Sequence, residues 1–180
     1  MKKYVWLFLL PILFCSFSKS DSIDISNFDS KKLEDIVFEK VNKLRIKKGK
    51  QALLKNDILK KAAQNQADYL LSKRKLTHNQ RNRSRRTPMK RVNFYQGDFS
   101  IVGENIASTH VLKRVSSPKS RRIVVLKTYE ELGEFLFQLW KNSKSHYENL
   151  LDNSYSYTGI SFSINTNTNR VCSVQVFGYR

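Results

Sequence analysis

The chain has 180 residues, of which 40% are hydrophobic, and it contains 33 lysines and arginines against 15 aspartates and glutamates. Its formal net charge of +18 at pH 7 favours attraction to anionic surfaces such as nucleic acid, acidic polysaccharide or phospholipid headgroups. Two cysteines are too few for a disulfide-rich scaffold, so we expect the fold to depend on core packing.

The first twenty residues have the layout of a secretory signal. Two lysines near the start precede an apolar run over residues 4–17, which is shorter than the ~20 residues of a membrane-spanning helix. Ser18 and Ser20 are small residues at the −3 and −1 positions for cleavage before Asp21. We therefore expect residues 1–20 to be a signal peptide and the protein to be exported.

Cys15, at the end of the apolar run, allows a second interpretation, in which it carries a lipid that anchors the protein to a membrane. Phe14 departs from this pattern, because a lipid-attachment motif normally has a small residue there. Soluble secretion and lipid anchoring both remain open. In either case Cys172 is the only thiol left for the domain, so no intramolecular disulfide can form.

The remaining residues suit one domain, with 21–32 as a polar linker and 33–180 as the folded part. Apolar residues recur at helical spacing from Leu33 to Leu44, and Gly49 ends this predicted helix.

A second helix is predicted to begin at Asn56 or Asp57, since either side chain can cap it. Residues 73–99 lose periodicity and gain charge, which predicts a long loop. A second loop, rich in serine, arginine and lysine, is predicted over residues 112–126.

A helix and two strands are predicted in the last third of the chain. Residues 128–131 form a capping box that opens the helix. Strands are predicted over residues 157–164 and 171–177, joined as a hairpin by residues 165–169. Helices first and strands last, with no βαβ rhythm, predict an α+β layered domain.

Five stretches match, in order and spacing, the motifs of one known family. They are Val41–Leu54, Leu76–Asn79, Gly103–Ala107, Trp140–Leu151 and Val174–Gly178. On these residues the chain resembles the bacterial type of the CAP family, which includes cysteine-rich secretory proteins, antigen 5 and plant pathogenesis-related proteins. The resemblance covers residues 33–178 and implies a three-layer α-β-α sandwich.

The resemblance also implies a surface cleft that gathers histidines and glutamates, and in some members holds a divalent metal. The matching residues here are His78, Glu104 and His146, a set that suits zinc. Two positions depart from the eukaryotic pattern. Cys172 stands where those members have the second histidine, and Ser143 stands where they have a glutamate. The implied metal site is therefore an altered one.

Each of these residues also has a purely structural interpretation. His78 can cap the end of a helix, Glu104 can hold a turn, and His146 can cap or pack at the start of a short helix. Cys172 shares its strand face with two valines, which predicts a packed apolar residue rather than a ligand. His110 lies outside every motif and is expected on a surface loop.

The sequence has none of the nucleophile motifs of hydrolases and no phosphate-binding glycine-rich loop. The leading interpretation is an exported, non-enzymatic binding module at or near the cell surface, whose cleft holds a divalent metal or a small ligand. The alternative is a metal-dependent hydrolase that uses the same three residues, with Glu148 as the base for a metal-bound water.

A basic cluster in the first predicted loop suggests a further class of ligand. Its members are Arg81, Arg83, Arg85, Arg86, Lys90 and Arg91. Such clusters contact nucleic acid, heparin or anionic lipid, although many are simply solvated loops. Export argues against nucleic acid, so the expected partner is an anionic glycan, a lipid surface or a host protein.

Overall fold

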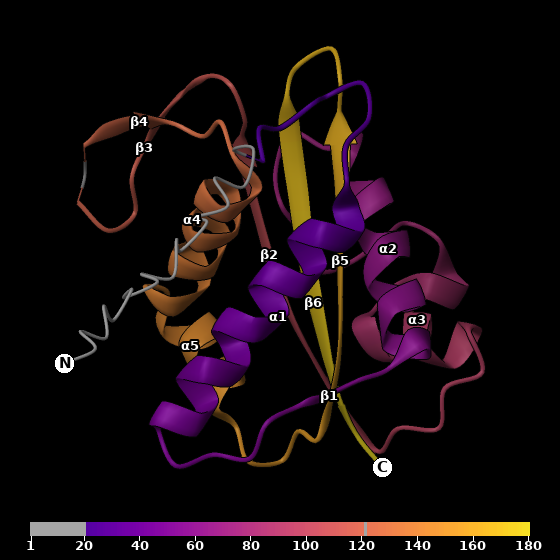
Figure 1. Ribbon diagram of the computed structural model, residues 1–180. Coiled ribbons are helices and arrows are strands. Elements are labelled where there is room, and N and C mark those ends of the chain that lie inside the picture. Colours follow the sequence, from indigo (N-terminus) through magenta and orange to yellow (C-terminus); the bar gives the residue numbers. More distant parts are fainter. Residues whose placement is uncertain (1–20, 121) are drawn as a thin grey trace, which may run out of the picture.

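The computed structural model describes residues 21–120 and 122–180, so the predicted signal peptide and Cys15 lie outside the described residues (Figure 1). The helices are α1 Ser30–Lys47, α2 Asp57–Leu71, η1 Arg83–Arg85, α3 Pro88–Phe94, α4 Tyr129–Lys141 and α5 Lys144–Leu151. The strands are β1 Leu54–Lys55, β2 Ile101–His110, β3 Arg114–Ser116, β4 Ile123–Val125, β5 Tyr157–Asn165 and β6 Arg170–Tyr179. None of the described helices combines the length and the apolar character needed to cross a membrane.

Four strands form the central sheet in the order β1-β5-β6-β2. Strand β1 runs parallel to β5, whereas β5 with β6 and β6 with β2 are antiparallel. The hairpin predicted between the last two strands is confirmed. Strand β2 forms one edge of the sheet, and β3 and β4 pair separately as a short two-stranded arm.

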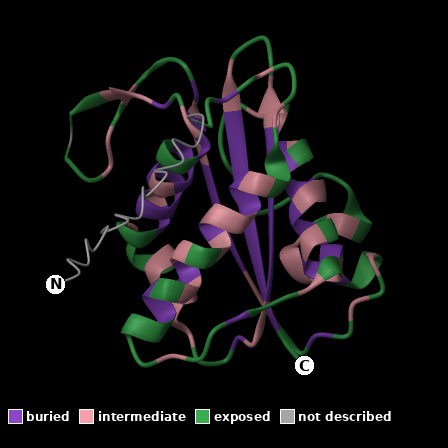
Figure 2. Ribbon diagram, in the orientation of Figure 1, coloured by how far each residue is buried: buried purple, intermediate pink, exposed green. Residues whose placement is uncertain are grey.

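Helices cover both faces of the sheet and give the three layers that were predicted (Figure 1). Helices α1, α4 and α5 share one hydrophobic cluster with the sheet, in which Trp140 and Leu136 are fully buried. Helix α2 packs on the other face through small residues such as Ala63 and Ala67, and α3 adds Val92. Strands β5 and β6 are buried between these two clusters along most of their length (Figure 2).

The helix ends follow local signals in the sequence. Asn56 caps α2, because its Oδ1 accepts hydrogen bonds from the amides of Ile58 and Leu59 at 3.0 and 3.1 Å. The predicted capping box at the start of α4 is present. Gly49 follows the end of α1 with φ of 68°, a left-handed conformation that glycine adopts without strain.

Three expectations are corrected by the structure. Residues 73–99 are not one loop, because they contain η1 and the seven-residue helix α3, which Thr87 caps. Residues 112–126 contain the strands of the β3–β4 arm. His110 is half-buried at the end of β2 and does not lie on a surface loop. The elements inside the two predicted loops have only three to seven residues, and such lengths leave little periodicity in the sequence.

Candidate functional site

Glu104 is the centre of a charged cluster beside the edge strand β2. Its Oε1 lies 2.8 Å from Nδ1 of His78, and its Oε2 accepts a hydrogen bond from Nη2 of Arg91 at 2.5 Å. The side chains of Glu104 and Arg91 are 1% and 0% exposed, whereas that of His78 is 48% exposed. The carboxylate is therefore held by two partners, and of the three only the imidazole reaches solvent.

Arg91 also fixes the segment that carries His78. Its Nη1 donates to the carbonyl oxygens of His78, Arg85 and Arg86 at 3.1, 3.2 and 3.3 Å. A guanidinium inside a protein is costly unless a carboxylate compensates it, and Glu104 does so here. The ion pair therefore holds α3 and the segment before it against β2.

Glu104 and Asn105 project to opposite faces of the sheet because side chains alternate along a strand. Glu104 meets α3, whereas Asn105 meets α5 on the other face. The Nδ2 of Asn105 donates to the carbonyl oxygen of His146 at 3.0 Å, and the Nδ2 of Asn149 donates to Oδ1 of Asn105 at 2.9 Å. Two consecutive residues of β2 thus hold the segments that carry the two histidines.

His146 is half-buried on α5. Burial lowers the pKa of His146 below its usual range, and the positive charge of the nearby His78 lowers it further. The structure therefore brings His78, Glu104 and His146, the three residues predicted to form a site, to the same edge of the sheet. We refer to them as the His78–Glu104–His146 cluster.

This cluster does not fit the zinc set that the resemblance implies. Both carboxylate oxygens of Glu104 already have a hydrogen-bond partner, and the buried guanidinium of Arg91 neutralises the negative charge that would attract a cation. Within residues 21–120 and 122–180, no group of three or more histidines, cysteines, aspartates or glutamates is arranged to hold a metal ion. The two imidazole rings are the metal-ligating groups left at this site.

The residues that depart from the family pattern do not complete the set. Cys172 is fully buried against α2 beside Val174 and Val176, which confirms its predicted place in the core. Burial raises the pKa of the Cys172 thiol, so it remains protonated at neutral pH. Ser143 is the N-cap residue of α5 and makes no side-chain cap bond. Glu148, the candidate base, is exposed on α5.

The predicted basic cluster is divided by the structure into exposed and buried residues. Arg81, Arg83, Arg86 and Lys90 are exposed, and we call these four residues the basic segment. The guanidinium of Arg85 lies over the ring of Phe94, 5.0 Å from its centre, and is partly buried. Arg91 is fully buried and bound to Glu104, so it is not available to a surface ligand.

Sequence reasoning treated Arg91 as one more surface cation and gave no role to Asn105 or Asn149. The sequence did contain a signal that Arg91 lies on a helix. Thr87 as a cap and Pro88 at the first helical position predict a helix that begins just before Arg91. Both asparagines lie within the family motifs, and their roles depend on a contact between distant segments of the chain.

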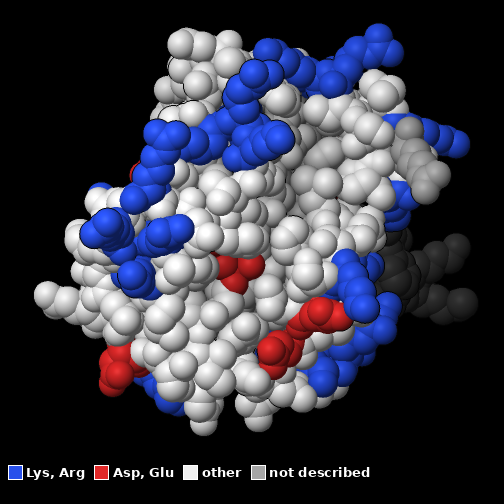
Figure 3. Space-filling model, turned by 180° about the vertical axis from the view of Figure 1, so that it is seen from behind, with Lys and Arg blue, Asp and Glu red and all other residues white. Residues whose placement is uncertain are grey.

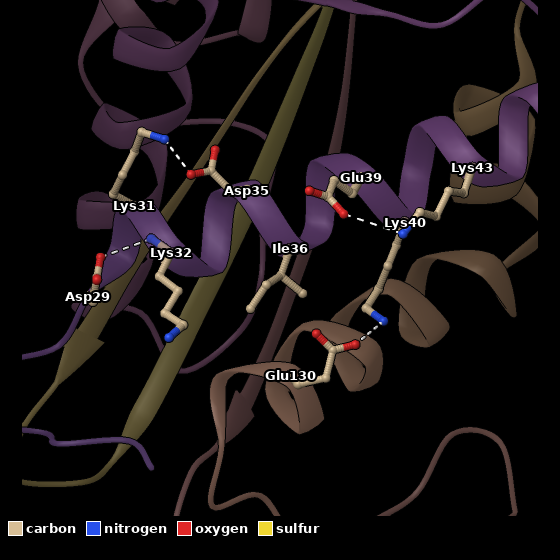
Figure 4. A pocket seen from close by; sticks show the side chains of 9 residues that line it. All are labelled: Asp29, Lys31, Lys32, Asp35, Ile36, Glu39, Lys40, Lys43 and Glu130. Atoms are coloured by element: carbon tan, nitrogen blue, oxygen red, sulfur yellow. Dashed lines mark hydrogen bonds and ion pairs between the residues drawn. The ribbon is translucent and has the colours of Figure 1, made fainter. Parts of the chain in front are cut away.

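A charged groove of about 450 Å³ lies elsewhere, along α1 and beside the start of α4 (Figure 4). Its lining includes four lysines and four acidic residues. Three of the lysines pair with acidic residues of the lining, and the fourth, Lys32, pairs with Asp21 outside it. Lys31 lies 2.5 Å from Asp35, and Lys40 lies 2.6 Å from Glu130. Because lysines and acidic residues are equal in number along the groove, it has no net charge to attract an ionic ligand, and we do not include it in the candidate site.

Comparisons with known proteins agree with this architecture. The model of the cysteine-rich secretory protein family, CAP, matches residues 38–177. An outer surface protein from Borrelia burgdorferi has a similar structure, with a TM-score of 0.66 and 25% identity, and the match covers 89% of this chain and 98% of that protein. A comparison with curated proteins finds no significant match.

Two further solved structures share the fold. An extracellular protein containing a SCP domain from Bacillus anthracis gives a TM-score of 0.64 at 17% identity, over 84% of this chain and 41% of that one. A cysteine-rich secretory protein from Staphylococcus aureus gives a TM-score of 0.57 at 15% identity, and the match covers 84% of this chain and 40% of that protein. This chain therefore spans less than half the length of these two proteins.

Proposed function

Because this chain belongs to the CAP family, we propose that it is an exported protein that acts at or near the cell surface as a non-enzymatic binding module. Two observations support export. The first twenty residues have the layout of a secretory signal. The similar structures include an outer surface protein and an extracellular protein.

The proposal that the module is not catalytic rests on the buried carboxylate of Glu104, which is already bound to His78 and Arg91. A carboxylate that acts as a metal ligand or as a general base needs a free lone pair directed at the metal or the proton. Here His78 and Arg91 each engage one oxygen, and the side chain is 1% exposed, so the remaining lone pairs are not accessible to a metal or a substrate. The imidazoles of His78 and His146 remain to contact a ligand, because each ring can donate or accept a hydrogen bond.

Calorimetric titration of zinc into residues 21–180 tests this proposal. This segment contains all the described helices and strands and both hydrophobic clusters. We expect no saturable binding, either in this protein or in the His78→Ala and His146→Ala variants. Saturable binding that either substitution abolishes would overturn the metal-free interpretation. The metal-dependent hydrolase would then become the leading candidate, and a peptidase assay with and without chelator would test it.

A second candidate function is the binding of an anionic glycan through the basic segment. Its four side chains are exposed, and within the described chain none of them lies within ion-pair distance of a carboxylate. His78, which is also exposed, lies three residues before Arg81. The segment and the imidazole together could therefore hold sulfate or carboxylate groups of a polysaccharide.

Binding to heparin at increasing salt tests this second function. The Arg81→Ala/Arg83→Ala/Arg86→Ala variant is expected to bind about tenfold more weakly, because three exposed charge contacts are lost. A matched Lys47→Ala/Lys48→Ala/Lys50→Ala variant removes the same charge at and beyond the end of α1 and is expected to bind as the parent protein does. Affinity that does not fall with salt would contradict an electrostatic mode of binding.

A further inference from the structure

Basic side chains from separate segments meet at the end of the sheet where β5 turns into β6. Arg170, the first residue of β6, donates from Nη1 to the carbonyl oxygens of Leu70 and Lys73 at 3.3 and 2.5 Å. Arg170 also pairs across the ladder with His110, the last residue of β2. Burial lowers the pKa of His110, and the charges of Lys113 and Arg170 lower it further, so these cations lie close to the ring.

The first described residues of the chain join the domain at the same end. The amide of Ile23 donates to the carbonyl oxygen of Lys127 at 2.7 Å. The amide of Leu112 donates to the carbonyl oxygen of Leu126 at 3.0 Å. The segment that begins at Asp21 therefore lies beside the residues that join β4 to α4, at the base of the β3–β4 arm and at the upper end of the molecule in Figure 1.

The cations at this end have no acidic partners in the described chain. Six of them form what we call the apical basic surface: Lys73, Arg74, Lys75, Lys113, Arg114 and Arg170. The described ion pairs of lysine and arginine lie on α1, β1, α2 and α3, and none involves these six. Figure 3 shows lysine and arginine side chains along the upper edge of the back face.

Acidic residues at this end do not neutralise the surface. Asp21 lies 2.5 Å from Lys32 and is therefore paired with a cation outside the set. The carboxylate of Asp24 accepts a hydrogen bond from the hydroxyl of Ser26 at 2.6 Å and keeps its negative charge, so it offsets at most one of the six cations. The uncompensated charge at this end is therefore positive.

We propose that the apical basic surface faces a membrane and binds the anionic headgroups of its phospholipids. Cys15, the candidate lipid-attachment site, lies six residues before Asp21, a distance that an extended chain covers in at most about 20 Å. An anchor at Cys15 would keep this end of the domain near the bilayer. Attraction to headgroups acts over a Debye length of about 8 Å, so the end nearest the anchor is where basic residues contribute.

This inference uses the export proposed above but concerns residues that belong neither to the His78–Glu104–His146 cluster nor to the basic segment. The membrane-binding inference and the binding functions proposed above can therefore be refuted independently of each other. Zinc titration reports on the cluster, and the loss of heparin affinity in the Arg81→Ala/Arg83→Ala/Arg86→Ala variant reports on the basic segment. Loss of vesicle binding in a variant of the apical basic surface reports on that surface.

The test is sedimentation of residues 21–180 with phosphatidylcholine vesicles that contain or lack phosphatidylglycerol. We expect binding only to vesicles that contain phosphatidylglycerol, and we expect it to weaken with salt. The Arg74→Gln/Lys75→Gln/Lys113→Gln variant is expected to lower the partition constant about 100-fold, or about fivefold for each charge removed.

A matched variant, Lys47→Gln/Lys48→Gln/Lys50→Gln, removes the same charge at the opposite end of the domain, at and beyond the end of α1 (Figure 1). It is expected to change the partition constant by less than about threefold, because only the long-range field changes. Circular dichroism and thermal unfolding of each variant establish that the fold is intact.

Several outcomes would overturn the proposal. An equal loss in both variants would show that binding follows net charge and not this surface. Loss of vesicle binding on substitution of the basic segment alone would assign the membrane contact to that segment. Competition by inorganic phosphate beyond that of sodium chloride at equal ionic strength would indicate a phosphate site. A larger loss of heparin affinity than of vesicle binding in the Arg74→Gln/Lys75→Gln/Lys113→Gln variant would indicate a polysaccharide surface.

Discussion

The two sides of the edge strand β2 hold their neighbouring elements by different chemistry. On the α3 side, the contact is an ion pair between Glu104 and Arg91, and both side chains are almost completely buried. On the α5 side, the contact joins the neutral amides of Asn105 and Asn149 and the carbonyl oxygen of His146. Loss of a partner leaves a buried charge in the first case and an unpaired neutral group in the second.

This difference separates the two histidines of the site. The segment of His78 depends on a charge balance inside the protein, because Arg91 holds both Glu104 and the carbonyl oxygen of His78. The position of His146 depends on neutral hydrogen bonds, which contribute less individually. The free energies of unfolding of matched variants on the two sides should therefore differ in size.

The largest effect is expected from Arg91→Met. This substitution leaves the carboxylate of Glu104 buried without its cation and removes the donor to three backbone carbonyl groups. Breaking a buried ion pair from one side costs about 3–5 kcal/mol. Urea unfolding of residues 21–180, followed by circular dichroism, measures this loss.

Two comparisons sharpen this prediction. Arg86→Met changes an exposed neighbour outside any described ion pair and should alter the free energy of unfolding by no more than about 0.5 kcal/mol. The Arg91→Met/Glu104→Gln variant removes both charges and should be more stable than the sum of the single losses predicts. If Arg91→Met costs no more than Arg86→Met, the ion pair does not hold this side of β2.

A smaller effect is expected from Asn105→Ala on the opposite side. It removes the donor to the carbonyl oxygen of His146 and the acceptor for Asn149, and no charge is left behind. We expect a loss of about 1–3 kcal/mol in the same urea experiment. Asn142→Ala, which removes one exposed hydrogen bond to Pro118, is the control and should cost less than about 0.5 kcal/mol. A loss as large as that of Arg91→Met would show that charge does not distinguish the two sides.

Much of the fold could be predicted because its signals are local. The caps at Asn56 and Thr128 are satisfied by amides within three residues, so the sequence alone specifies them. Strand β2 was not predicted, since the adjacent polar residues Glu104 and Asn105 break the alternation that marks a strand. They do so because β2 is an edge strand with polar partners on both faces, and those partners come from distant parts of the chain.

The candidate site could be predicted only in part for a related reason. The family motifs identified His78, Glu104 and His146, which the structure places at one edge of the sheet. The motifs did not show that Glu104 is already engaged, because Arg91 stands in a run of arginines that look alike in sequence. The two arginines differ because Arg91 lies on α3, on the face that packs against the domain, whereas Arg86 precedes α3 and is exposed.

The smallest expected effect is on the proton equilibrium of His146, which links the two sides of β2. Burial lowers the pKa of His146, and the charge of His78 adds to this. The unfolded chain therefore binds a proton more readily than the folded one, so stability falls as pH drops below the ordinary histidine value of about 6.5 and is regained as pH rises. His146→Gln should reduce this loss at low pH.

The His78→Gln variant tests the link directly, by titration of the imidazole of His146 in an NMR experiment. Removing the charge of His78 should raise the pKa of His146 toward its ordinary value, while burial keeps it below that value. Asn142→Ala, which leaves His78, His146 and Asn105 in place, is the control and should leave the pKa of His146 unchanged. If the pKa of His146 is the same with and without His78, the two rings do not interact, and a ligand that contacts one histidine would not sense the other.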